Sequence, residues 1–291
     1  MRRVAVLTIL VLASASLWAC SSKQTASPTP SASGTSSATP STPTTSTATA
    51  MLDHEPTGTV TMSWSSSTNK LTVGISMIGL GPNSTHPAHI HSGTCANTGN
   101  VIYPLDPVTA TATGDATVTT TVSNVGGGIP ASGWSLNVHT GPALTPADQY
   151  RPIACIDISN PSHAATFTGA FKPVPGTGND VTGTAVVSLD PTAHSLGMSL
   201  TVHGLDPNTA HAAHVHEGSC EAQGPVVYSL PNVKSDATGT GSVTATFSGV
   251  TATAIPSTWY VNVHNTTDVS TQVGFTPLSC GNLVRGQSAM P

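Results

Sequence analysis

A pattern of histidines and cysteines occurs twice in this chain with one constant separation. The first occurrence comprises His86-Pro87-Ala88-His89-Ile90-His91, Cys95, His139 and Cys155, and the second comprises His211-Ala212-Ala213-His214-Val215-His216, Cys220, His264 and Cys280. His211 follows His86 by 125 positions, and Cys280 follows Cys155 by the same 125. Such chemically demanding residues rarely keep one spacing by chance, so the pattern predicts a tandem duplication.

The amino-terminal segment has the features of an export signal. Arg2 and Arg3 precede an apolar run that is too short to span a bilayer, and Leu17-Trp18-Ala19-Cys20 resembles a lipobox. We therefore expect residues 1–20 to be a lipoprotein signal peptide, with lipidation at Cys20 attaching the chain to a bacterial membrane. An ordinary signal peptide, with Cys20 incidental, is the alternative. Both interpretations place the mature chain outside the cytoplasm.

The segment that follows is expected to be a tether. Residues 21–51 are nearly all Ser, Thr, Pro and Ala, and such a stretch has too little apolar surface to offset the entropy of ordering it. About 240 residues remain, which suits two domains of ordinary size. We predict a first domain at 52–160 and a second at 165–291.

Charge is scarce along the whole chain. Charged residues make up 7% of the sequence and the formal net charge is −5. There is no basic run to hold a phosphate backbone, so nucleic acid is excluded as a partner.

Both halves are expected to be all-β. Segments such as Thr59–Trp64, Leu71–Met77 and Gly183–Leu189 alternate in polarity, are rich in β-branched residues, and are bounded by turn-forming residues. The pattern predicts an antiparallel sandwich or barrel of about seven or eight strands in each copy. Residues 166–172 are predicted to be an extra first strand of the second copy.

Four cysteines fall two to a copy. Disulfides between Cys95 and Cys155 and between Cys220 and Cys280 would each raise the free energy of unfolding by about 4 kcal/mol in the chain-entropy model. An exported protein favours disulfides over free buried thiols, which are the alternative.

The histidines favour a metal site in each copy. Residues i and i+2 of a strand face one side, so His89 and His91 converge, as do His214 and His216. His139 and His264 lie just before the terminal cysteines, whose disulfides would bring them back to these pairs. Three imidazoles suit copper, or zinc with an open position. His86 and His211 are expected to support the sites through hydrogen bonds rather than to bind the metal.

The order of these residues resembles Cu/Zn superoxide dismutase. His214-Val215-His216-Glu217 is similar to that family's copper strand, and Pro152–Ile158 is similar to its last cysteine strand. The resemblance implies Greek-key β-sandwich domains, one disulfide per domain, and superoxide as a small anionic substrate. It also implies six copper ligands, which are His89, His91, His139, His214, His216 and His264.

The chain departs from that family in two ways. No histidine lies between Cys95 and His139 or between Cys220 and His264, so the zinc site and the metal-bridging histidine are missing. The family's catalytic arginine, which steers the anionic substrate, precedes its last cysteine by three residues; Arg151, four residues before Cys155, is the candidate for that role in the first copy, and Thr276 occupies the matching place in the second. We therefore expect any superoxide dismutation to be weak and to reside chiefly in the first copy.

A second resemblance is to the chordin-type (CHRD) domain. The His89-Ile90-His91 strand, the run Tyr260-Val261-Asn262-Val263-His264 and the ending Val284-Arg285-Gly286-Gln287 are similar to that family. This resemblance implies a non-catalytic extracellular binding or copper-storage module. A zinc hydrolase is a third alternative, for which Glu217 is the candidate general base.

Overall fold

The computed structural model describes residues 45–145, 147–172 and 180–286. These residues lie in one compact unit, Thr42–Pro291. The predicted signal peptide, Cys20 and most of the predicted tether lie outside the described residues. In the described ranges no helix is long and apolar enough to cross a membrane.

The structure is all-β, as predicted, apart from two single-turn helices in the described residues, α1 (Ala147–Tyr150) and α2 (Gln272–Phe275). The strands form two lobes with separate hydrophobic cores. The first lobe comprises β2 to β11, and the second comprises β12 to β21 together with β1.

The first lobe contains two four-stranded antiparallel sheets. One has the order β11-β2-β3-β8 and the other β10-β9-β5-β6, with the small pair β4-β7 beside them. The strands are β2 (Thr57–Ser65), β3 (Lys70–Ile78), β4 (Thr85–His86), β5 (Ala88–Gly93), β6 (Thr98–Pro104), β7 (Val108–Thr109), β8 (Ala116–Val122), β9 (Trp134–His139), β10 (Pro152–Ile158) and β11 (Thr166–Ala170).

The second lobe repeats these elements in one continuous nine-stranded sheet. Its order is β16-β15-β19-β20-β1-β12-β13-β18, with β21 pairing onto β1 and the small pair β14-β17 separate. The strands are β1 (Ser46–His54), β12 (Thr182–Asp190), β13 (Ser195–His203), β14 (Ala210–His211), β15 (Ala213–Gly218), β16 (Gln223–Ser229), β17 (Val233–Lys234), β18 (Gly241–Ser248), β19 (Trp259–His264), β20 (Pro277–Asn282) and β21 (Val284–Arg285).

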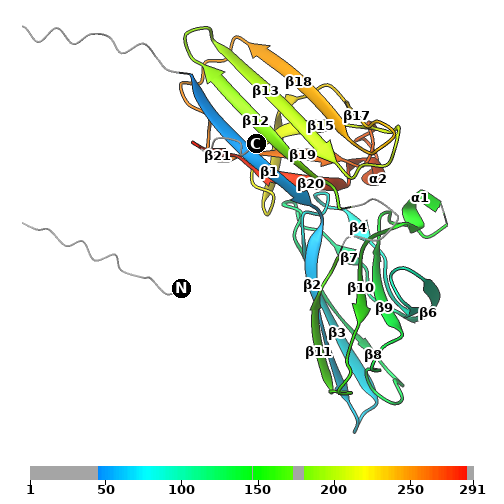
Figure 1. The fold of residues 1–291 in the computed structure, drawn as a ribbon. Coiled ribbons are helices and arrows are strands. Elements are labelled where there is room, and N and C mark those ends of the chain that lie inside the picture. Colours follow the sequence, from blue (N-terminus) through cyan, green and yellow to red (C-terminus); the bar gives the residue numbers. More distant parts are fainter. Residues whose placement is uncertain (1–44, 146, 173–179, 287–291) are drawn as a thin grey trace, which may run out of the picture. The chain divides into compact units, whose positions relative to one another are not determined.

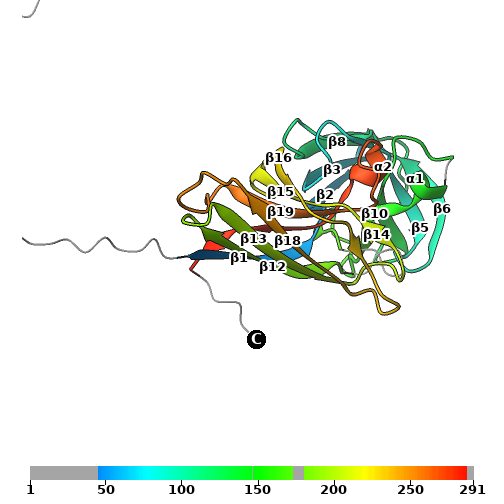
Figure 2. The ribbon, with the colours of Figure 1, turned by 90° about the horizontal axis from the view of Figure 1, so that it is seen from above.

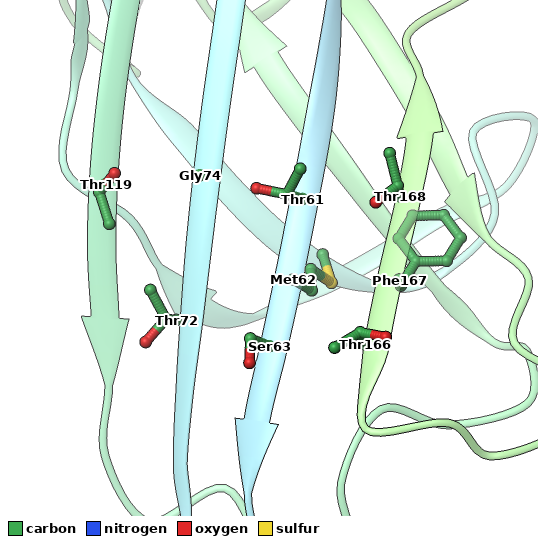
Figure 3. Close-up of a pocket in the computed structure, with 9 residues that line it drawn as sticks. All are labelled: Thr61, Met62, Ser63, Thr72, Gly74, Thr119, Thr166, Phe167 and Thr168. Atoms are coloured by element: carbon green, nitrogen blue, oxygen red, sulfur yellow. The ribbon is translucent and has the colours of Figure 1, made fainter.

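The cores come from the alternation that the sequence shows. In β3 every second residue from Leu71 to Met77 is buried, while the intervening side chains are more exposed. Those intervening residues and their neighbours form a face of hydroxyl side chains: Figure 3 shows Thr61 on β2 beside Thr168 on β11, and Thr119 on β8 at the far side of β3. Polar residues with high strand propensity can cover a sheet face without charge.

Strand β1 corrects the predicted end of the tether. Residues 46–51 were assigned to the disordered segment, but Ser46–His54 is a strand with Ala48, Ala50 and Leu52 in the second core. Alternation of small apolar residues with threonine is enough for a strand when a neighbouring sheet supplies the rest of the burial. Figures 1 and 2 show β1 alongside β12, and every residue from Ser46 to Leu52 has a partner there.

Strand β11 corrects a second expectation. Residues 166–172 do contain a strand, but it pairs with β2 of the first lobe and does not extend the second copy's sheet. Phe167 and Phe171 pack with the first core, because its sheet offers them apolar partners.

Candidate metal centre

Strand β5 carries the first two histidines of the cluster in the first lobe. It runs between β6 and β9 in the sheet, so its backbone is held on both sides. His89 and His91 lie on one face, while Ile90 between them is fully buried in the core. His139 ends the neighbouring strand β9, and its amide donates a hydrogen bond to the carbonyl of Pro87.

These three imidazoles meet as the spacing predicts. One ring nitrogen from each of His89, His91 and His139 lies within 4.8 Å of the other two. Nδ1 of His89 and Nε2 of His139 are 3.2 Å apart, and the ring centroids are 5.2 to 6.0 Å apart. Zinc binds histidine nitrogen at about 2.0–2.1 Å, so a small contraction would place one ion in contact with all three rings.

Backbone carbonyls fix which nitrogens face the centre. Nδ1 of His91 donates to the carbonyl of Gly99 at 3.0 Å, and Nδ1 of His139 donates to that of Tyr150. A hydrogen bond at Nδ1 sets the tautomer and leaves Nε2 as the acceptor. Nε2 of His91 is buried and has no hydrogen-bond partner among the described residues.

The second lobe builds the same arrangement from β15 and β19. Nitrogens of His214, His216 and His264 also lie within 4.8 Å of one another. Nδ1 of His216 donates to Gly224 at 2.9 Å, and Nδ1 of His264 donates to Phe275 at 2.8 Å. Nδ1 of His214 and Nε2 of His216 and of His264 are buried without a partner in the described part of the chain.

Burial lowers the pKa of five of the clustered histidines. Desolvation lowers the pKa of His139 and His214 to about 4 and that of His264 to about 3, with smaller contributions from neighbouring imidazoles. The pKa of His89 and of His216 is also lowered, chiefly by burial. Neutral imidazole is the form that binds a metal ion, so proton competition at neutral pH is weak.

His86 and His211 support the clusters from behind, in the geometry expected of them. Nδ1 of His86 donates to the carbonyl of His139 at 2.8 Å, and its Nε2 lies 2.7 Å from the Ser84 hydroxyl. Nδ1 of His211 donates to the carbonyl of His264 at 3.0 Å. Each supporting histidine thus fixes the backbone of the third histidine of its cluster.

Both predicted disulfides are present. Cys95–Cys155 and Cys220–Cys280 have Cα–Cα distances of 5.9 and 5.8 Å, within the normal range for a disulfide. Each links the loop after the paired histidines to the strand that follows the third histidine. The bonds therefore hold together the two segments that supply each cluster.

Arg151 and Glu217 are placed differently from the clustered histidines. The Arg151 guanidinium makes an ion pair with Asp206 at 3.3 Å, so its charge is directed at that carboxylate. Glu217 is exposed and alternates with His216 along β15, which turns its side chain to the opposite face. The catalytic role suggested for Arg151 and the base suggested for Glu217 stay predictions.

Aromatic neighbours of the clusters were missed by the sequence reasoning. Tyr150 stacks on His139 with ring centroids 4.9 Å apart, and Phe275 packs on His264 at 4.8 Å. Tyr260 stacks on His216 at 4.9 Å, where the first lobe has Ser135 at the corresponding position. The signal available in the sequence was the position of these residues on the same short segments as the ligands.

The chain was compared with known protein families and with curated proteins, and the family match covers β11 and most of the second lobe. No curated protein matches the chain. The two disulfides and the domain type found are consistent with an extracellular protein. The matched segment contains His211, His214, His216 and His264 and ends before Cys280. A CHRD domain is found at residues 163–273.

Proposed function

We propose that this protein is an extracytoplasmic CHRD-type module that binds one copper ion in each lobe through three histidines. The observation that carries the proposal is the convergence of three buried imidazole nitrogens in the second lobe, none of which has a hydrogen-bond partner among the residues that the structure describes. A buried polar atom without a partner costs about 1–3 kcal/mol, so three in one place are unfavourable unless something binds there.

The donor set favours copper. Each cluster offers imidazole nitrogen alone, which suits copper and zinc, and nitrogen sites generally bind Cu²⁺ more tightly than Zn²⁺. The residues that would hold the ion are His89, His91 and His139 in one lobe and His214, His216 and His264 in the other. Bound copper would supply one-electron chemistry; the chain's own groups orient the ligand rings.

The CHRD domain favours a binding or storage role over superoxide dismutation. The side chain suggested for steering an anionic substrate, Arg151, is engaged with Asp206. We therefore propose retention of the metal as the activity, with superoxide turnover as an outcome to be measured.

The constant spacing supports a second domain of the same type in the first half. The hydrogen bond from His86 to His139 recurs between His211 and His264, and both disulfides span a separation of 60 residues. We propose that the two lobes arose by duplication.

Membrane attachment through Cys20 completes the proposal. The Leu17-Trp18-Ala19-Cys20 sequence supports lipidation, which incorporation of labelled palmitate would detect. Replacing Cys20 by Ser should release the exported chain into the medium or periplasm. Labelling that persists in the Cys20→Ser variant would refute the anchor.

Metal analysis of the full chain tests the binding proposal. We expect two copper ions per chain after dialysis against a weak chelator, one in either His91→Ala or His216→Ala, and none in the double variant. His203→Ala is the matched control, because His203 is exposed and lies outside both clusters. Two ions retained by the double variant would overturn the proposal, and a preference for zinc would overturn the choice of copper.

Protein folding and metal coordination need separate measurements in these variants. Near-ultraviolet circular dichroism and disulfide mapping establish that each variant is folded. Electron paramagnetic resonance of the copper-loaded chain should then show nitrogen ligation that disappears with the histidines. Copper signals unchanged between His91→Ala and His203→Ala would exclude the cluster in the first lobe.

A further inference from the structure

Two strands, β1 and β11, occupy the same position in the two lobes, and we name them the clasp strands. Thr166 of β11 lies opposite Ser63, and Thr47 of β1 lies opposite Ser188. Ser63 and Ser188 are themselves 125 positions apart, so the two clasp strands pair at one register. Figure 3 shows the first of these pairings, with Thr166 beside Ser63.

Each clasp strand also reaches the other sheet of its lobe. Beyond β11, Lys172 forms a bridge with Cys155, and at the end of β1, Asp53 pairs with Cys280. Both clasp strands therefore join the two sheets next to a disulfide cysteine. In the second lobe this junction makes the sheet continuous through β20, β1 and β12.

Strand β1 is separated in the chain from the lobe that it completes, whereas β11 lies between β10 of the first lobe and β12 of the second. Strand β1 completes the second lobe, yet only residues 55 and 56 separate it from β2 of the first lobe. Strand β11 completes the first lobe, yet the chain continues from it into β12 of the second. If each clasp strand is grouped with the strands that follow it, each group donates its clasp strand to the other. This is the connectivity of a strand-exchanged dimer within one chain.

Strand β1 is held in the second lobe by noncovalent contacts alone. Ala48, Ala50 and Leu52 are at most 1% exposed and belong to the second core. Without β1, both β12 and β20 would have an unpaired edge, which is a template for another strand. The first lobe has no such dependence on β1, because β11 fills its clasp position.

We propose that β1 exchanges between molecules, so that β1 of one chain completes the second lobe of another copy. The place of β1 beside β12 and β20 fits the β1 strand of a second copy, because that strand presents the same side chains in the same register. Exchange of an identical element replaces every contact that it breaks, which makes it a low-cost route to a dimer. Strand β11 occupies the edge of β2, so β1 has no place in its own first lobe and is available for donation.

Cross-linking of two singly substituted chains tests the exchange. Thr49 lies opposite Val186 in the β1–β12 pairing, so one chain carries Thr49→Cys and the other carries Val186→Cys. Both full chains also carry Cys20→Ser, which removes that thiol from the reaction. After co-incubation at high concentration and mild oxidation, we expect a covalent heterodimer linked at positions 49 and 186, identified by peptide mapping.

A control pair of variants measures how much cross-linking arises from random collision. Thr119→Cys replaces Thr49→Cys, since Thr119 lies on β8, which does not pair with β12 in the described sheets. We expect at least about tenfold more heterodimer from the first pair, equivalent to a preference of about 1.4 kcal/mol. Equal yields from the two pairs would overturn the proposal.

An engineered disulfide within one chain, called the staple, provides a second test that leaves no unpaired engineered thiol. The double variant Thr49→Cys/Val186→Cys should close a disulfide within one chain and hold β1 in its own second lobe. Wild-type chains with two different peptide tags should then co-purify after co-incubation, whereas stapled chains should not. Co-purification at the same level with the staple, or none in the wild type, would refute exchange of β1.

Discussion

Replacing Leu52 by Ala should destabilise the second lobe, although Leu52 precedes the first lobe in the chain. The side chain is 1% exposed and lies in the second core. Leu→Ala substitutions in cores cost about 2–5 kcal/mol, depending on how far the surroundings collapse into the cavity. Gly183, the residue paired with Leu52, has no side chain to move into the space, so we expect about 3–5 kcal/mol.

Hydrogen exchange of the intact chain, followed by mass spectrometry of peptides, measures this cost in each lobe. Peptides from β12 and β13 should lose protection by about a hundredfold or more, because every 1.4 kcal/mol is a factor of about ten. Peptides from β2 and β3 should be unchanged. Met51→Ala is the matched control on the same strand: Met51 is 66% exposed, and its loss should change stability by about 0.5 kcal/mol or less. Loss of protection in β2 and β3, with β12 unaffected, would refute the assignment of β1 to the second lobe.

Three further predictions concern pH and the disulfides. Without metal, the free energy of unfolding should fall as the pH drops from about 6.5 towards 3. The reason is that His264 and His139 have pKa values of about 3 and about 4 in the folded chain, so they bind fewer protons there than in the unfolded chain. Urea midpoints that coincide at pH 7 and pH 5 would contradict this. Glu55 should change the free energy of unfolding in the opposite direction. Burial raises its pKa to about 8, so the stability contributed by the protonated carboxyl is lost as the pH rises from 4.5 through 8. Glu55→Gln should therefore raise the free energy of unfolding at pH 7 by about 3 kcal/mol in denaturant titrations. Replacing Cys95 and Cys155 together by Ala should lower the stability of the first lobe by about 4 kcal/mol, measured by calorimetry, while a second lobe that melts at a changed temperature would show that the lobes are coupled.

The clusters were predictable because strand geometry is local. Alternation alone places His89 and His91 on one side of a strand, and the spacing to Cys155 predicted that His139 would return to them. The carbonyls of Gly99 and Tyr150 that orient the rings were not predictable, since a backbone acceptor leaves no mark in the sequence.

The clasp strands show why pairing is harder to predict than strand content. The alternation of Thr47 to Ala50 is a strand signal, but nothing local says which sheet such a strand joins. Residues 166–170 carry the same kind of signal, and the prediction that they belong to the second copy is wrong, because they pair with β2 of the first lobe. The partner of an edge strand is decided by contacts far away in sequence, which a local pattern does not encode.

The aromatic rings beside the two proposed copper sites make the molecule its own reference for metal chemistry. Both clusters present the same three imidazoles, but Tyr150 is 44% exposed beside His139, whereas Tyr260 is fully buried against His216. Within one polypeptide the two centres share the solvent, the free metal concentration and the redox poise of any solution. A difference between them in affinity, exchange rate or potential would therefore measure what a neighbouring ring and its shielding from water do to an otherwise identical ligand set.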